Sequence, residues 1–401
     1  MRAIFTAVVY NRGMSANDLP IYLDHAATTP TDPEVAAAML PYLGGPASYG
    51  NPSSIHRYGR AARAAVDAAR DAVAALIQAD YSEIYFTGSG TEADNLALIG
   101  TMLAAPPERN HLVTTAMEHH AVLHTAHFLQ EQGYAVTIVP VDSDGLVSPE
   151  AVAEAITDQT ALVSVMHANN EIGTIQPIAE IARLAHARGA KFHTDAVQTA
   201  GLLPIAVRAL DCDLLTLSAH KIYGPKGIGA LYIRQGTKVS PILHGGAQER
   251  EKRAGTENVA AIVGFGRAAQ LTRERRAADA ARLTALRDRF LALLRQAVPG
   301  LRLNGHPTLR LPNNVNVSVE GAAGATLLMS LDRLGVAASS GSACSSGSIE
   351  PSHVLKAIGL PDSLASSGVR FTLGRGTTEA ELERAADLFA QAVRRFSDRI
   401  S

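Results

Sequence analysis

The sequence predicts an α/β fold in which a large domain, built on a mostly parallel seven-stranded sheet between helices, is joined to a smaller α+β domain. Three observations predict it. The chain has 401 residues, which is more than one hydrophobic core usually organises. Short apolar runs alternate with longer helical patterns from about residue 57 to 275. From about residue 276 this alternation stops.

Seven short apolar runs are expected to form the strands of the large domain. Alanine-rich amphipathic segments, such as residues 121–132 and 178–188, lie between several of these runs. Strand–helix alternation of this kind predicts a mostly parallel sheet with helices on both faces. The expected strands are residues 84–86, 111–115, 135–139, 161–165, 190–193, 214–217 and 229–233.

The C-terminal part has the pattern of a smaller α+β domain. A long charged helix is expected over residues 273–297, because the helical pattern ends there before Pro299-Gly300. The elements expected after it are a strand over 314–319, a helix over 325–334, a Ser/Gly-rich loop and a last helix from 378 to about 396.

These patterns give the expected domain boundaries. Residues 31–275 form the large domain, and residues 21–30 together with 276–401 form the small one. Residues 1–20 are a separate N-terminal extension. Their apolar part, residues 3–10, is short, and no small-residue cleavage pattern follows it cleanly. A disordered extension or a mis-assigned start is therefore favoured over an export signal.

The charge balance argues against two classes of partner. The chain carries 36 Lys and Arg against 38 Asp and Glu, a formal net charge of −2. Such a balance does not point to nucleic acid or to an anionic membrane surface. No apolar run reaches the roughly 18 residues of a membrane span. We expect neither nucleic-acid nor membrane binding.

The cysteine content indicates a reducing compartment. Two cysteines, Cys212 and Cys344, cannot form a disulfide framework in a chain of this length. We therefore expect a cytoplasmic location. Cys212 precedes an apolar run and is expected to be a small buried residue. Cys344 lies instead among Ser, Gly and Ala residues, a composition typical of a mobile loop with little to bury.

Polar or ionisable residues follow five of the expected strands. This matters because ligands of open α/β sheets bind at the carboxyl ends of the strands. A glycine-containing turn before a helix can also bind an anion through backbone N–H groups. The five segments are Thr87-Gly88-Ser89-Gly90-Thr91-Glu92, Glu118-His119-His120, His167-Ala168-Asn169-Asn170-Glu171, Asp195 with Gln198, and Ser218-Ala219-His220-Lys221.

Each of these features has an ordinary structural explanation when it is taken alone. A Gly-rich turn is often only a tight turn, a lone His is usually packed or at the surface, and a lone Lys is usually solvated. An Asp after a strand is most often a helix N-cap. The joint pattern is much less expected by chance, and it matches the needs of pyridoxal phosphate.

Pyridoxal phosphate requires a lysine for a Schiff base, a carboxylate at its ring nitrogen and a cradle for its phosphate. Lys221 and Asp195 are the candidates for the first two tasks. The remaining candidates are Gly90 in the anion-binding turn, Thr91, Ser218 and His220 at the phosphate, His119 stacked on the ring, and Asn170 and Gln198 at its periphery. No metal is expected.

Several motifs, in order along the chain from about residue 20 to 395, resemble those of the cysteine desulfurases. These are the NifS/IscS group of class V, fold-type I pyridoxal-phosphate enzymes. The N-terminal motifs are Tyr22-Leu23-Asp24-His25-Ala26-Ala27-Thr28-Thr29-Pro30, Gly50-Asn51-Pro52-Ser53-Ser54 and Thr91-Glu92-Ala93-Asp94-Asn95. The central ones are Asn169-Asn170-Glu171-Ile172-Gly173 and Ser218-Ala219-His220-Lys221-Ile222-Tyr223-Gly224-Pro225-Lys226-Gly227. The C-terminal ones are Ser339-Ser340-Gly341-Ser342-Ala343-Cys344 and Val369-Arg370-Phe371-Thr372-Leu373-Gly374-Arg375.

The resemblance implies roles around the cofactor. Lys221, rather than Lys226, is the Schiff-base lysine, and Asp195 is the partner of the ring nitrogen. His119 stacks on the ring and moves protons. Thr256 reaches the phosphate from the other subunit, which implies a homodimer.

The resemblance also implies the reaction. L-Cysteine is the substrate, bound through its carboxylate by Arg370 with Asn170 beside it. Cys344 accepts the sulfur as a persulfide, L-alanine leaves, and an iron–sulfur scaffold or sulfur-carrier protein takes the sulfur onward. Two alternatives stay open: another class V enzyme, such as an aminotransferase or a selenocysteine lyase, and a non-catalytic protein that binds pyridoxal phosphate. Retention of both Lys221 and Cys344 argues against the second.

Overall fold

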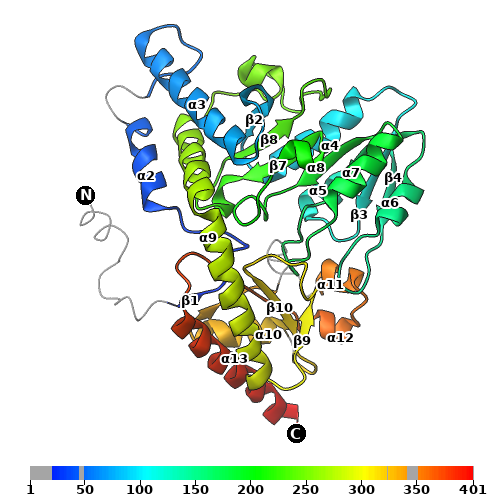
Figure 1. The fold of residues 1–401 in the computed structure, drawn as a ribbon, viewed down its shortest axis with the longest axis vertical. Helices are drawn as coiled ribbons and strands as arrows, with labels where there is room; N and C mark the ends of the chain where they lie inside the picture. Colours follow the sequence, from blue (N-terminus) through cyan, green and yellow to red (C-terminus); the bar gives the residue numbers. More distant parts are fainter. Residues whose placement is uncertain (1–19, 45–48, 323, 341–350, 401) are drawn as a thin grey trace.

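The computed structural model describes residues 20–44, 49–322, 324–340 and 351–400. A seven-stranded sheet forms the centre of its larger part, as predicted, and most neighbouring strands run parallel (Figure 1). The order across the sheet is β2-β8-β7-β6-β5-β3-β4, with β8 antiparallel to both of its neighbours. The strands are β2 (Ile84–Thr87), β3 (His111–Thr115), β4 (Ala135–Val139), β5 (Thr160–Ser164), β6 (Lys191–Asp195), β7 (Leu214–Ser218) and β8 (Gly229–Ile233).

Helices cover both faces of this sheet. Successive residues of one strand belong to different hydrophobic clusters: Leu214 packs in one and Leu215 in the other. Side chains that alternate in this way fit a sheet buried on both faces. The helices of this part are α2 (Pro33–Met39), α3 (Arg57–Leu76), α4 (Gly90–Ala104), α5 (His120–Glu131), α6 (Pro149–Ala155), α7 (Ile178–Ala187) and α8 (Val207–Leu210).

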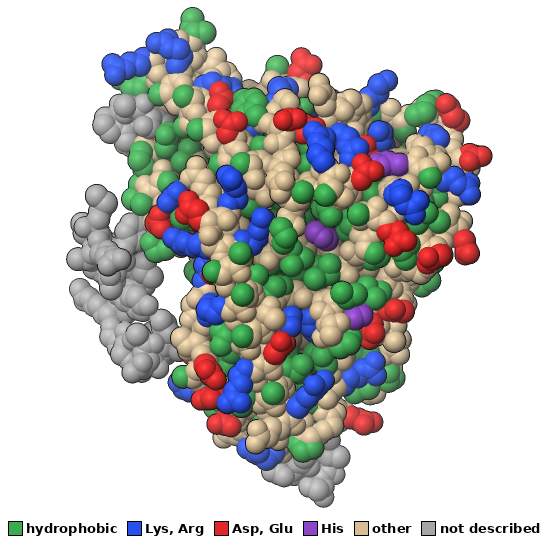
Figure 2. Space-filling view, viewed as in Figure 1, with side chains coloured by type: hydrophobic (Ala, Val, Ile, Leu, Met, Phe, Trp, Pro, Cys, Tyr) green, Lys and Arg blue, Asp and Glu red, His purple; other side chains and the backbone are tan. Residues whose placement is uncertain are grey.

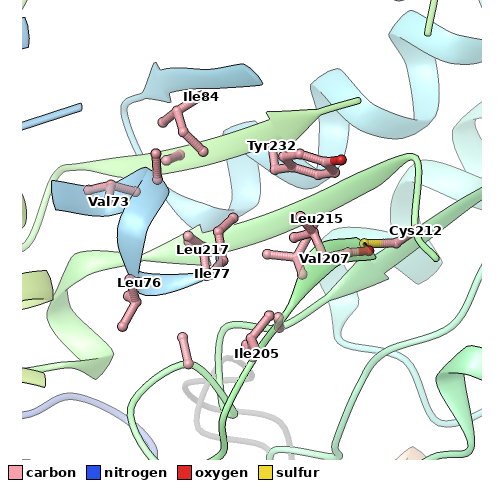
Figure 3. Packing of buried hydrophobic residues seen from close by; sticks show 14 of the residues in the cluster. Val73, Leu76, Ile77, Ile84, Ile205, Val207, Cys212, Leu215, Leu217 and Tyr232 are labelled. Atoms are coloured by element: carbon pink, nitrogen blue, oxygen red, sulfur yellow. Dashed lines mark hydrogen bonds between the residues drawn. The ribbon is translucent and has the colours of Figure 1, made fainter. Parts of the chain in front are cut away.

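Cys212 lies in the core of this part, as the sequence predicts. Figure 3 shows its sulfur among Val207, Leu215 and neighbouring apolar side chains. Burial raises the pKa of the Cys212 thiol to about 12. A thiol that stays protonated at neutral pH is a poor nucleophile, so Cys212 is a packing residue.

Helix α9 (Val259–Ala297) is longer than the sequence predicts. The expected start at residue 273 is wrong by more than three turns. The first part of the helix, including Ile262, Phe265 and Leu271, is buried in the core of the larger part. Residues 259–266 carry no polar side chain, so the start of the helix lacks the charged face that marks the rest as a surface helix. Asn258 caps its start by accepting a hydrogen bond from the Ala261 N–H at 3.2 Å.

A second hydrophobic core lies at the other end of α9, in the lower part of Figure 1. An antiparallel sheet of order β12-β10-β9 and a parallel pair, β1 with β11, surround it. Ile21 and Leu23 pack there with Phe290 and Phe371. The elements are β1 (Ile21–Tyr22), β9 (Arg302–Asn304), β10 (Asn314–Ser318), α10 (Gly324–Arg333), β11 (Val336–Ala337), α11 (His353–Ala357), α12 (Asp362–Ala365), β12 (Val369–Thr372) and α13 (Glu379–Ile400).

The two cores bear on the expected domain boundaries. Residues 21–23 pack with the C-terminal elements, in line with their assignment to the small domain. Helix α9 continues through residue 275 without a break, so the two parts share one helix. The division into two domains at that residue stays a prediction.

The surface carries charges of both signs. On the face shown in Figure 2, basic and acidic side chains are interspersed. None of the helices in the described ranges is long and apolar enough to cross a bilayer.

Candidate active site

A cavity of about 360 Å³ lies at the carboxyl ends of the parallel strands. It is lined by expected site residues that follow five different strands, and by Arg370 from the small antiparallel sheet. Every predicted site residue in the described ranges lines it except Thr256. The lining residues are Ala26, Ala27, Ser89, Gly90, Thr91, Asp94, His119, Met166, Asn170, Asp195, Val197, Gln198, Ser218, His220, Lys221 and Arg370.

The N-terminus of α4 forms one wall of the cavity. Ser89 caps this helix, and its hydroxyl accepts a hydrogen bond from the Glu92 N–H at 3.0 Å. Gly90 follows in a tight space, where a Cβ atom would lie 3.2 Å from Val197 Cγ2 and 3.3 Å from Ser218 Cβ. The absence of a side chain thus brings the first N–H groups of the helix close to the end of β7. Such N–H groups bind anions.

His220 lies beside this helix end in a neutral form. Burial, followed by the charges of Lys221 and Lys226, lowers the pKa of His220 to about 4. Its Nδ1 is 3.1 Å from the Thr28 hydroxyl, which holds the ring in place. A neutral imidazole, a serine hydroxyl and a helix N-terminus are together a suitable donor set for a phosphate group.

Lys221 comes from the short turn after β7, and its amine points to the segment that follows β1. Nζ donates hydrogen bonds to the carbonyl oxygens of Ala26 and Ala27, the latter at 2.7 Å. Gln198 Nε2 donates to the same Ala26 carbonyl at 3.1 Å. The amine is therefore fixed at the wall of the cavity, where it can bind an aldehyde covalently.

Asp195 ends β6 and is 6 % exposed. Burial raises its pKa to about 6, against the opposing effects of the Val197 N–H and the Lys221 charge. The Val197 N–H donates to Oδ1 at 2.8 Å, which orients the carboxylate. A protonated ring nitrogen beside it would favour the ionised form, because an opposite charge stabilises a buried carboxylate.

His119 caps α5 from the edge of the cavity. Its Nδ1 accepts a hydrogen bond from the Ala121 N–H at 3.1 Å, so the neutral ring carries its proton on Nε2. Burial, and then the nearby Lys221 charge, lower the pKa of His119 to about 4. The ring is therefore neutral at pH 7, which suits both stacking on an aromatic ring and proton exchange.

Arg370 lies in β12 and is 1 % exposed. Its guanidinium donates to Asp24 Oδ1 at 2.9 Å and to the Asn170 carbonyl at 3.0 Å. A buried guanidinium oriented by a carboxylate and a carbonyl is well placed to bind a further carboxylate from a small molecule. Asp24 was missed as an individual site residue, although it belongs to the opening motif found in the sequence.

Two further acids near the cavity belong to segments quoted from the sequence, but no individual role was predicted for them. Glu118 is fully buried and accepts hydrogen bonds from the Thr115 hydroxyl at 2.7 Å and the Met166 N–H at 2.9 Å. Burial raises the pKa of Glu118 to about 8. Burial and the Asp195 charge raise the pKa of Asp94 well above its ordinary value. Asp195 is therefore the acid of the three that carries charge most readily at neutral pH.

One predicted residue lies elsewhere, and another is outside the described residues. Thr256 lines a separate cavity of about 170 Å³ with Gly88 and Arg253. Its predicted role at the phosphate of a second subunit stays a prediction. Cys344 lies outside the described residues, so its role as sulfur acceptor stays a prediction as well.

The residues present fit pyridoxal phosphate at each of its three recognition points. The α4 N-terminus with Ser218 and His220 suits the phosphate, Asp195 suits the ring nitrogen, and Lys221 suits the aldehyde. Together with the strand order and the position of the cavity, they define a pyridoxal-phosphate-dependent enzyme.

Comparison with known proteins identifies the family of pyridoxal-phosphate-dependent enzymes to which the chain belongs. The chain belongs to the aminotransferase class-V family, whose sequence model matches residues 21–385. It is 49% identical over 373 residues to a protein named cysteine desulfurase IscS from Dictyoglomus turgidum, covering 93% of this chain and 94% of that one. A protein of the same name from Methanosarcina thermophila is 48% identical over 382 residues, covering 95% and 94%. A structure described as a NifS-like protein superimposes with a TM-score of 0.87 and 34% identity, covering 94% of this chain and all of that one.

Proposed function

We propose that this chain is a cysteine desulfurase, which takes the sulfur atom from free L-cysteine and releases L-alanine. The observation that carries the proposal is the single cavity in which Lys221, Asp195, the α4 N-terminus and Arg370 meet. The 49% identity to a protein named cysteine desulfurase, over 93% of the chain, supports this choice within the family.

Pyridoxal phosphate, when bound, supplies an electron sink for the electron pair left when the Cα–H bond of the substrate breaks. The protein has to keep the ring nitrogen protonated, and Asp195 is the buried carboxylate suited to that task. Gly90, Thr91, Ser218 and His220 would hold the phosphate. Asn170 and Gln198 would hold the edge of the ring, and His119 would lie against its face.

Arg370 binds the carboxylate of the substrate and thereby fixes the orientation of its Cα–H bond. Asp24 and the Asn170 carbonyl hold the guanidinium before the substrate arrives. Lys221 Nζ then acts as the base that removes the Cα proton and returns one during release. His119 exchanges a proton through Nε2, because Nδ1 is occupied by the Ala121 N–H.

Cys344 receives the sulfur. Its thiolate attacks the sulfur of the substrate, the bond from that sulfur to Cβ breaks, and the electron pair of this bond goes to Cβ. Protonation there completes alanine, and the sulfur stays on Cys344 as a persulfide. No external oxidant or reductant is required until an acceptor takes the sulfur.

The proposed partners follow from this chemistry. A sulfur-carrier or iron–sulfur scaffold protein removes the persulfide sulfur, and the reactive thiol requires a reducing compartment such as the cytoplasm. We also propose a homodimer. Its contact region includes the large apolar residues near α2 and α3 that the single chain leaves exposed: Leu40, Leu43, Tyr49, Ile55 and Tyr58.

The test uses the pyridoxal-phosphate-loaded protein with L-cysteine and a thiol reductant. We expect equal amounts of alanine and sulfide from the wild type. Cys344→Ser should retain the cofactor absorbance but lose sulfide release by about a hundredfold or more, because the nucleophile is removed. The buried-thiol variant Cys212→Ala is the control and should remain active.

Three results would contradict the proposal. Full sulfide release by Cys344→Ser would remove the acceptor role. A keto acid in place of alanine would indicate an aminotransferase. Cofactor binding with no product at all would indicate a non-catalytic binding protein.

A further inference from the structure

Three consecutive residues after β8 adopt a strained backbone. Glu249, Arg250 and Glu251 have φ angles of 45°, 53° and 64°, and none of them is glycine. Left-handed conformations are unfavourable for such residues because Cβ crowds the following carbonyl. A run of three persists only where surrounding contacts enforce it. We call residues 249–251 the left-handed turn.

A buried ion pair enforces the left-handed turn. Glu249 is 6 % exposed, and its two carboxylate oxygens pair with Arg70 Nη1 at 2.6 Å and Nη2 at 2.7 Å. The same carboxylate accepts the Phe86 N–H at 2.9 Å. These hydrogen bonds hold the left-handed turn against α3 and β2. They also fix the direction in which the chain continues after residue 251.

The chain that leaves the turn carries Arg253 to the start of α4. Arg253 Nε donates to Glu92 Oε1 at 2.8 Å, and Nη2 donates to Oε2 at 3.3 Å. Glu92 Oε2 also accepts the Gly88 N–H at 2.8 Å. Gly88, Glu92 and Arg253 pack closely together. A Cβ atom on Gly88 would lie 2.7 Å from Glu92 Oε2 and 3.5 Å from Arg253 Nη2.

Glu92 creates an electrostatic conflict at this position. It lies in the first turn of α4, the same turn whose residues Gly90 and Thr91 line the cavity. A carboxylate there is favoured by the helix dipole, but it repels a second anion at the same helix end. A cofactor phosphate would be that second anion.

We propose that Arg253 is a positioning residue that cancels the charge of Glu92, so that the N-terminus of α4 can bind the phosphate of the cofactor. The inference rests on the proposed function, because it concerns the same phosphate. The left-handed turn places the Arg253 guanidinium beside Glu92, and this role accounts for the retention of the strained backbone at residues 249–251.

The experiment compares two aldehydes that differ only in the phosphate. Apoprotein is titrated with pyridoxal phosphate and with pyridoxal, and binding is followed by absorbance. We expect Arg253→Met to weaken binding of pyridoxal phosphate about tenfold and to leave pyridoxal binding unchanged. Adding Glu92→Gln to that variant should restore the binding of pyridoxal phosphate, because the uncompensated charge is removed.

Arg250→Met is the matched control. It deletes an arginine of the same turn, whose guanidinium bonds the Ile84 carbonyl and stacks 4.2 Å from the Tyr85 ring centroid, away from Glu92. Its affinity for both aldehydes should match the wild type. Glu92→Gln alone tests the same charge effect without touching the turn, and it should bind pyridoxal phosphate at least as tightly as the wild type.

Two results would overturn the inference. If the Glu92→Gln change fails to restore binding in the double variant, Arg253 acts through another contact, such as the position of Thr256 three residues on. If Arg253→Met weakens both aldehydes equally, its effect is a general loss of structure. Failure of the proposed function is seen separately, as a wild type that binds pyridoxal phosphate but produces no alanine from cysteine.

Discussion

Glu118 shows what a buried side chain adds to a site without touching the reactants. In the described part of the chain its Oε2 atom has no hydrogen-bond partner, while Oε1 accepts two. A carboxylic acid in such a place is favoured in its neutral form. Its hydrogen bonds link Thr115, at the end of β3, to Met166, which lines the cavity.

Stability at alkaline pH should therefore depend on Glu118. Burial raises the pKa of Glu118 from 4.5 to about 8, so the neutral acid stabilises the fold below pH 4.5, and this stabilisation is lost as the pH rises through about 8. Glu118→Gln stays neutral at all pH values. From about pH 5 to about pH 9 its free energy of unfolding should rise relative to the wild type by on the order of 3 kcal/mol. Urea titrations of both apoproteins measure this, and a difference independent of pH would contradict it.

The sequence predicts the residues that act through their own chemistry and misses those that act through burial. Lys221, Asp195 and His119 stand out because ionisable groups at strand ends are unexpected in a turn. Glu118 sits in the same kind of position, yet only its complete burial distinguishes it from a solvated acid. The role of Asp24 is visible only from its hydrogen bond with Arg370. Nothing in the sequence shows that two residues 346 positions apart lie together in the fold.

At the scale of secondary-structure elements, hydrophobic periodicity predicts the strands well and helix starts less well. The expected strands at residues 111–115, 135–139 and 229–233 match β3, β4 and β8. The start of α9 at Val259 was missed because its first residues, 259–266, carry no polar side chain and so show no polar face. Periodicity reports the contrast between two faces, so it fails wherever both faces are buried.

The ion pair between α3 and the left-handed turn gives a prediction at this scale. Glu249→Gln leaves the buried Arg70 guanidinium without its counter-charge, which should lower the free energy of unfolding by about 3 kcal/mol. The exposed pair of Lys356 and Asp362, 3.4 Å apart, is the control. Asp362→Asn should change stability by less than about 1 kcal/mol. Equal changes in the two variants, measured by urea unfolding, would contradict the buried ion pair as the stabilising contact.

At the scale of the whole molecule, the residues of the candidate site come from elements of both cores. Lys221 and Asp195 follow strands of the large sheet, whereas Arg370 comes from the small sheet and Asp24 from the segment after β1. The cavity therefore lies where the two parts, which share α9, meet.

The oligomeric state is a second property of the whole molecule. We expect the wild type to elute as a dimer in gel filtration, because Ile55 is 90 % exposed and Leu43 is 66 % exposed in the single chain. The double variant Leu43→Glu with Ile55→Glu should elute as a monomer. Met329→Glu, at a 57 % exposed position on α10, should leave the dimer intact. A monomeric wild type would remove the proposed homodimer.

The covalent attachment of the cofactor tests the central claim most directly. The protein loaded with pyridoxal phosphate is reduced with borohydride, digested and mapped by mass spectrometry. The reduced cofactor should be found on the peptide that carries Lys221, and Lys221→Ala should carry none. A protein that remains colourless with pyridoxal phosphate, or an adduct on Lys226 instead, would contradict the assignment of this cavity as the active site.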